Sequence, residues 1–104
     1  MTFPRGTTQT IQVRVPGVDL TGATAYMSFR QGGSVVVEKY PSISYSSPDS
    51  VASATLSQDD TLLFKEGLVE YQVRYLVGTT AGATEIFPCY VTKILKDGKI
   101  SHIS

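Results

Sequence analysis

The chain has 104 residues, 41% of them hydrophobic and 17% charged, which predicts one globular domain, residues 1–104, that can fold without metals or disulfides. Nine basic and nine acidic residues give a formal net charge of zero, so we expect neither nucleic acid nor an anionic membrane as a partner. The same neutrality removes a barrier to self-association, and we expect a homo-oligomer.

Two alternating segments, residues 8–15 and 23–30, open the chain. Alternation of apolar and polar residues is typical of strands with one buried and one solvated face. The predicted inward residues are Ile11, Val13 and Val15 in the first segment and Ala23, Ala25, Met27 and Phe29 in the second. The start of the chain shows no apolar signal-peptide core, and no apolar run is long enough to span a membrane, so we expect synthesis in the cytoplasm.

The middle of the chain predicts three further strands. Gly32 and Gly33 favour a tight hairpin turn into residues 35–40, where three consecutive valines indicate burial on both faces or a strand end tucked under a loop. Pro41 then interrupts the ladder of hydrogen bonds. The two later strands are a short one around Ile43 and Tyr45 and a longer one over residues 51–56.

Residues 57–64 interrupt the β pattern and predict a single helical turn. Ser57 can accept a hydrogen bond from the first free N–H groups, and Asp60, three residues later, completes a capping box. The pair Asp59–Asp60 also raises the question of calcium, but the repeated carboxylate spacing of a calcium loop is missing. We therefore expect no metal site here, and we expect the turn to carry the chain from one sheet to the other.

The last third predicts two long strands, residues 68–77 and 83–93. In the first, the predicted inward residues are Val69, Tyr71, Val73, Tyr75 and Val77. In the second, Pro88 cannot donate to a ladder and so marks an edge or a bulge. Cys89 lies at an inward position, where we expect a structural thiol without a disulfide partner. His102, near the C-terminus, is expected to be exposed and inert.

These elements together predict an all-β fold, an immunoglobulin-like antiparallel β-sandwich of about seven strands with one short helical turn near residues 57–64. Three features resemble a known family: the opening Arg5-Gly6-Thr7-Thr8, the joint Asp19-Leu20-Thr21-Gly22-Ala23-Thr24, and the helical turn and glycine before a Tyr/Val strand. They resemble the N-terminal immunoglobulin-like domain of phage baseplate upper proteins and related small prophage tail proteins. This resemblance implies a structural or adaptor component of a virion, in the tail or baseplate, with other virion or tail proteins as partners.

The sequence suggests neither catalysis nor a cofactor. Its one His lies near the C-terminus, and it contains no GxSxG or phosphate-loop motif. We expect a non-enzymatic protein that acts through protein–protein assembly. The alternatives are a carbohydrate- or receptor-binding module of a host-recognition apparatus and a bacterial surface or periplasmic domain, the latter disfavoured by the missing signal peptide.

Four residues are candidates for the interface. Tyr40 and Tyr45 flank Pro41 beside a Ser-rich segment, and tyrosine offers an apolar body with a polar tip, as interfaces favour. Pro41 and Pro88 are expected to mark controlled strand edges, because proline limits indiscriminate pairing. The predicted interface is therefore a sheet edge together with the loop around residues 40–45.

Overall fold

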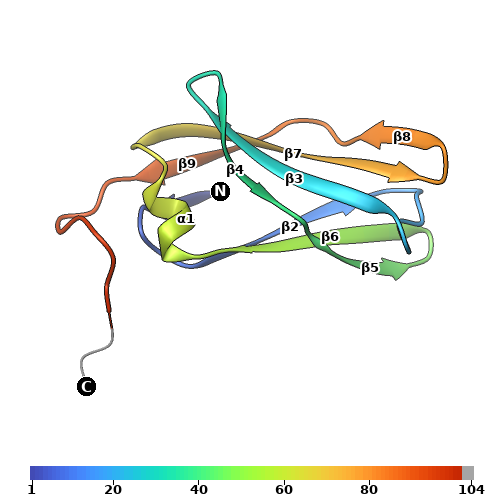
Figure 1. The fold of residues 1–104 in the computed structure, drawn as a ribbon, viewed down its shortest axis with the longest axis horizontal. Coiled ribbons are helices and arrows are strands. Elements are labelled where there is room, and N and C mark those ends of the chain that lie inside the picture. The colour runs from blue at the N-terminus through green and yellow to red at the C-terminus, as the bar shows by residue number, and fades with distance from the viewer. Residues whose placement is uncertain (102–104) are drawn as a thin grey trace.

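The computed structural model describes residues 1–101, which fold into two packed β-sheets with a short helix at one end (Figure 1). The elements are β1 (Thr2–Pro4), β2 (Gln9–Val15), β3 (Thr24–Gln31), β4 (Ser34–Lys39), β5 (Ser42–Ser46), β6 (Asp49–Leu56), α1 (Gln58–Leu62), β7 (Gly67–Val77), β8 (Thr80–Ala83) and β9 (Phe87–Thr92). The predicted all-β sandwich with one short helical element is confirmed.

The strand order is that of an immunoglobulin sandwich. A six-stranded sheet runs β1-β9-β7-β3-β4, with β8 paired to β7, and a three-stranded sheet runs β2-β6-β5. The smaller sheet therefore occupies the places of strands B, E and D, and β9-β7-β3-β4 those of G, F, C and C′. All described pairs are antiparallel except β1 with β9, which is parallel.

The core lies between the sheets and uses the alternating residues that the sequence predicts. Ile11 and Val13 of the smaller sheet and Met27, Phe29 and Val73 of the larger sheet are all buried. The aromatic contacts that close the core are Phe29–Tyr71 at 5.5 Å, Phe29–Phe64 at 6.2 Å and Phe3–Phe64 at 6.4 Å between ring centroids. The chain has one Cys and no Trp, so its core lacks the inter-sheet disulfide and the tryptophan that antibody domains use. Burial of apolar side chains stabilises the core instead.

Helix α1 is fixed at both ends by side chains. At its start, the Ser57 hydroxyl accepts the Asp60 N–H at 3.2 Å and the Asp60 carboxylate accepts the Ser57 N–H at 2.8 Å, so the predicted capping box is confirmed. At its end, the Arg5 guanidinium donates to the carbonyls of Leu62 at 2.8 Å and Phe64 at 2.6 Å. Arg5 thereby satisfies carbonyls that a helix end leaves free, and it fastens the β1–β2 loop to α1.

The loop from β2 to β3 is organised around the buried Ser50. The Ser50 hydroxyl donates to the Val18 carbonyl at 2.7 Å and accepts the Leu20 N–H at 2.9 Å. Leu20 is fully buried, and the Asp19 carboxylate accepts the Thr21 N–H at 2.9 Å, closing an Asx turn. The Asp-Leu-Thr-Gly joint therefore has a structural role: it sets the path of the chain between the sheets.

The number of strands differs from the prediction of about seven, since residues 1–101 form nine. β1 has three residues, too few for a periodic pattern to show. The predicted strand over residues 83–93 is shorter in the structure, where β9 covers Phe87–Thr92, and β8 (Thr80–Ala83) is an additional strand that ends just before Thr84. There the Thr84 hydroxyl accepts the Val73 N–H at 3.1 Å and the Thr84 carbonyl accepts the Gln72 side chain at 2.7 Å, so side-chain bonds replace the regular ladder.

The prediction that the three consecutive valines are buried together is wrong. A register shift pairs Phe29 with Val37 but Arg30 with Val35, which makes Val36 the extra residue of a β-bulge. Val37 is buried and Val36 is half-buried against the core, whereas Val35 is 59% exposed. The bulge therefore turns one valine out onto the surface of the sheet.

The C-terminal segment leaves the sandwich beside α1 (Figure 1). It is tethered there by ion pairs from Arg5 to Asp97 at 2.6 Å and from Lys99 to Asp59 at 3.2 Å, and by hydrogen bonds between Gln58 and the Ile100 backbone. The segment adds no strand up to residue 101. The prediction for His102 lies outside the described residues.

Candidate functional site

The solvated side of β4, β3, β7 and β9, which we call the outer sheet face, is the feature most unlike an ordinary protein surface. Its side chains are Tyr26, Ser28, Arg30, Val35, Glu38, Tyr40, Leu68, Glu70, Gln72, Arg74, Leu76, Ile86, Pro88 and Tyr90. Twelve large hydrophobic or aromatic side chains are exposed in residues 1–101, and seven of them lie on this face. Apolar exposure is therefore concentrated here rather than scattered singly.

The centre of the outer sheet face is a shallow open hollow of about 230 Å³. Val35 and Ile86, both at least half exposed, lie among its lining residues. Within it, Arg30 and Glu70 form an ion pair across β3 and β7 at 2.8 Å. Both partners are largely exposed, so this pair adds little to stability. Its effect is to leave the centre of the hollow without net charge.

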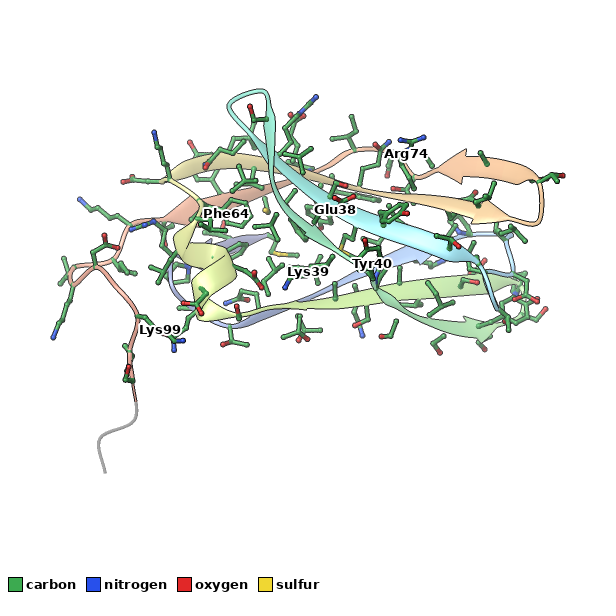
Figure 2. All side chains as sticks on the ribbon, in the orientation of Figure 1. Glu38, Lys39, Tyr40, Phe64, Arg74 and Lys99 are labelled. Carbon is green, nitrogen blue, oxygen red and sulfur yellow. The ribbon has the colours of Figure 1, made fainter. Side chains whose placement is uncertain are left out.

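Two further charges lie on the outer sheet face, Arg74 as a residue that lines the hollow and Glu38 outside it. Glu38 lies on the edge strand β4 and Arg74 on β7, with β3 between them (Figure 2). The register sets Glu38 beside Ser28 and Arg74 beside Tyr26, so the two are offset along β3 as well as across it. Within residues 1–101 neither Glu38 nor Arg74 forms an ion pair or a side-chain hydrogen bond.

An aromatic pair, Tyr26 and Tyr40, lies on the outer sheet face beside Arg74, which pairs with Tyr26 in the register. The rings of Tyr26 and Tyr40 have centroids 5.2 Å apart and are tilted by 55°. Tyr40 is 78% exposed, although it follows directly on an ordered strand. Such a pair presents a rigid apolar surface with two hydroxyl groups, the kind of surface that interfaces use.

The four candidate interface residues do not form one surface. Tyr40 and Pro88 both lie on the outer sheet face, on opposite sides of β3 and β7. Pro41 lies in the crossover from β4 to β5, and Tyr45 lies on β5 in the other sheet, paired with Ser50. Pro88 of β9 pairs with Glu70 of β7 on one side. On its other side β9 pairs with β1, but only from Tyr90 onward, so within residues 1–101 Pro88 lies at an open strand edge, as predicted.

The exposed side of the three-stranded sheet has a different chemistry. Its side chains come from β2, β5 and β6 and are mainly polar: Thr10, Gln12, Arg14, Ser42, Ser44, Val51, Ser53 and Thr55. The Thr10 and Thr55 hydroxyls lie 3.1 Å apart and hydrogen bond to each other. The large exposed apolar side chains are therefore more numerous on the outer sheet face than on the exposed side of the three-stranded sheet.

The reactive side chains are engaged in structure. Burial raises the pKa of the Cys89 thiol to about 11, so it stays protonated and unreactive. Burial also acts to raise the pKa of Asp60, but the hydrogen bond from Lys39 and those from Ser57 outweigh it and leave the pKa below its usual value.

Among residues 1–101, no group of three or more His, Cys, Asp or Glu side chains could hold a metal ion. No helix in that part of the chain has the length and apolar character needed to cross a membrane.

Comparisons with known proteins support the fold. No protein-family model matches the chain, and no curated protein matches it. Two solved structures are similar over 83% of this chain, each with a TM-score of 0.57 and 18% identity: an uncharacterized protein from Listeria monocytogenes EGD-e, and the cycloalternan-forming enzyme from Listeria monocytogenes in complex with a pentasaccharide substrate. The chain spans 8% of the length of either. At this identity the likeness concerns the sandwich itself.

The sequence analysis selects Tyr40 and Pro88 as candidate interface residues, but it does not select the other apolar residues of the outer sheet face. Leu68 and Leu76 occupy outward positions of β7. Two leucines at outward positions of an alternating strand could have been recognised in the sequence as exposed apolar residues. Val35 could not be found in this way, because the bulge that exposes it depends on pairing with β3.

Proposed function

We propose that this protein is a non-catalytic assembly domain, a structural or adaptor component of a phage or prophage tail or baseplate that acts through protein–protein contacts. The observation that carries the proposal is the concentration of exposed apolar and aromatic side chains on the outer sheet face. A concentration of exposed apolar and aromatic side chains on one face is typical of a protein-interaction site. The virion setting rests on the resemblance of residues 5–8 and 19–24 to the phage family.

The chemistry of the described residues fits a role without catalysis. A nucleophile needs a base within hydrogen-bond reach, whereas the Cys89 thiol is buried among apolar side chains. The carboxylates of Asp59 and Asp60 each pair with a lysine. The hollow on the outer sheet face is shallow and open, so it does not exclude water as reactive sites do.

The test is incorporation into particles. Phage particles are induced from the bacterium that encodes the chain, purified on a density gradient and analysed by quantitative mass spectrometry. We expect this protein in a fixed ratio to the tail proteins. We also expect the double variant Val35→Glu/Ile86→Glu to be folded, since both side chains are exposed, but depleted from particles.

The matched control is Ser44→Glu/Ser53→Glu, which adds the same two charges to the exposed side of the three-stranded sheet. This variant should be incorporated like the wild type. Absence of the wild-type protein from purified particles contradicts the virion proposal. Equal incorporation of both double variants contradicts the role of the outer sheet face.

A second candidate function is a carbohydrate- or receptor-binding module, favoured by the exposed Tyr26–Tyr40 pair beside the polar groups of Ser28 and Arg74. One structural neighbour is an enzyme whose structure contains a pentasaccharide substrate. An oligosaccharide array is the test, with Tyr40→Ala expected to lose binding and Tyr45→Ala, on the other sheet, expected to keep it. Binding with this pattern, together with absence from particles, replaces the assembly proposal by this one.

A further inference from the structure

The outer sheet face carries opposite charges in a self-complementary arrangement. Glu38 and Arg74 lie on the two sides of β3, offset from each other by two residues along it. Two strand spacings separate β4 from β7, about 10 Å, so the carboxylate and guanidinium do not meet within one copy. Each is thus a charged group without an ionic partner within residues 1–101. Arg74 is among the residues that line the hollow, and Glu38 lies outside it on β4.

We propose that the outer sheet face binds the same face of a second copy of this chain about a two-fold axis, with Glu38 of each copy paired to Arg74 of the other. The inference rests on the proposed assembly function and names its partner. Consider a two-fold axis that lies in the plane of the contact and crosses β3 midway between the two charges. If this axis is perpendicular to the line that joins the charges, it exchanges their positions. It therefore forms two symmetry-related ion pairs from groups that have none in the single chain.

The same axis brings the apolar groups together. Tyr26 lies next to the crossing point on β3 and Tyr40 stacks against it, so the aromatic pairs of the two copies meet near the axis. Val35 and Ile86 at the hollow then lose contact with water. Burial of such side chains is the principal driving force of association, while the flanking charges fix orientation and register.

Charge and size both suit a second copy. Arg30 and Glu70 already neutralise each other, and Glu38 balances Arg74, so the face repels no copy of itself. Four strands give a width of about 19 Å, and a strand of eight residues such as β3 a length of about 26 Å. The product, about 490 Å², is roughly three fifths of the ~800 Å² that each partner buries in a standard interface, which fits a small and weak dimer.

The test is charge reversal measured by sedimentation equilibrium over a wide range of protein concentration. We expect the wild type to form dimers. Glu38→Arg alone, or Arg74→Glu alone, should raise the dissociation constant about tenfold or more, because each places two pairs of like charges in the dimer. The double variant Glu38→Arg/Arg74→Glu should restore dimerisation, because it reverses both partners.

Two controls change net charge by the same amount away from the outer sheet face. Glu66→Arg and Lys93→Glu alter exposed residues that have no ionic partner within residues 1–101, and both should dimerise like the wild type. A monomeric wild type overturns the inference. Equal effects of the single reversals and the double variant, without restoration, also overturn it.

Failure of this inference and failure of the proposed function have different signatures. A wild type that is monomeric but present in phage particles overturns the second copy as the occupant and leaves the assembly function standing. A dimer that shows the charge-reversal pattern but is absent from particles supports the inference and contradicts the virion proposal.

Discussion

Ser50→Ala should destabilise the domain by about 2 kcal/mol. The hydroxyl is fully buried and makes two hydrogen bonds, donating to Val18 at 2.7 Å and accepting from Leu20 at 2.9 Å. Alanine fills nearly the same space, so no cavity forms, but the buried Leu20 N–H loses its partner. An unsatisfied buried donor costs about 1–3 kcal/mol.

Urea unfolding followed by circular dichroism measures this loss, with the slope of the transition expected to stay unchanged. In thermal unfolding, 2 kcal/mol corresponds to a drop in Tm of about 10 °C for a domain of this size. The control is Ser44→Ala, which removes an exposed hydroxyl and should stay within about 0.5 kcal/mol of the wild type. If the two variants lose the same small amount, Ser50 does not hold the β2–β3 loop.

Three further predictions concern the core and the titrating groups. Val73→Asp should abolish folding, because it buries an unpaired charge, whereas Gln72→Asp on the opposite side of β7 should remain folded by circular dichroism; equal tolerance would show that the two do not face opposite sides. Asp60 should stabilise the fold above about pH 4 and lose this contribution as the pH falls through its folded-state pKa, because that pKa lies under its usual 3.8; Asp60→Asn should therefore weaken the loss of stability in acid-unfolding measurements. Cys89 should resist thiol reagents at neutral pH until the domain is unfolded; rapid labelling of the native protein would contradict its burial.

Local patterns in the sequence were sufficient for much of the fold. The alternation in residues 68–77 assigns Val73 to the core and Gln72 to the other side of the strand, as the structure shows. The capping box of Ser57 and Asp60 is also local, since it spans three residues. Each of these predictions depends on neighbours along the chain, which is the information that a sequence displays directly.

The features that the sequence did not predict depend on pairing between distant segments. Val35 is exposed because of a bulge against β3, and the regular ladder of β8 ends before Thr84, whose hydroxyl accepts the Val73 N–H. The relation between Glu38 and Arg74 arises only when the sheet order places β3 between their strands. Likewise, the contact between the Tyr40 and Tyr26 rings and the hollow on the outer sheet face follow from register, which the sequence alone does not show.

We expect the outer sheet face to be covered when the protein is assembled. Thiol labelling tests this directly, because the buried Cys89 contributes no background in the native state. Ile86→Cys places a thiol on the outer sheet face, and Ser44→Cys places one on the opposite sheet. We predict that the I86C variant is labelled rapidly as a dilute isolated domain and at least tenfold more slowly in purified particles, while the S44C variant is labelled at similar rates in both. Equal labelling rates of the I86C variant in the two states would show that the outer sheet face is not covered in particles.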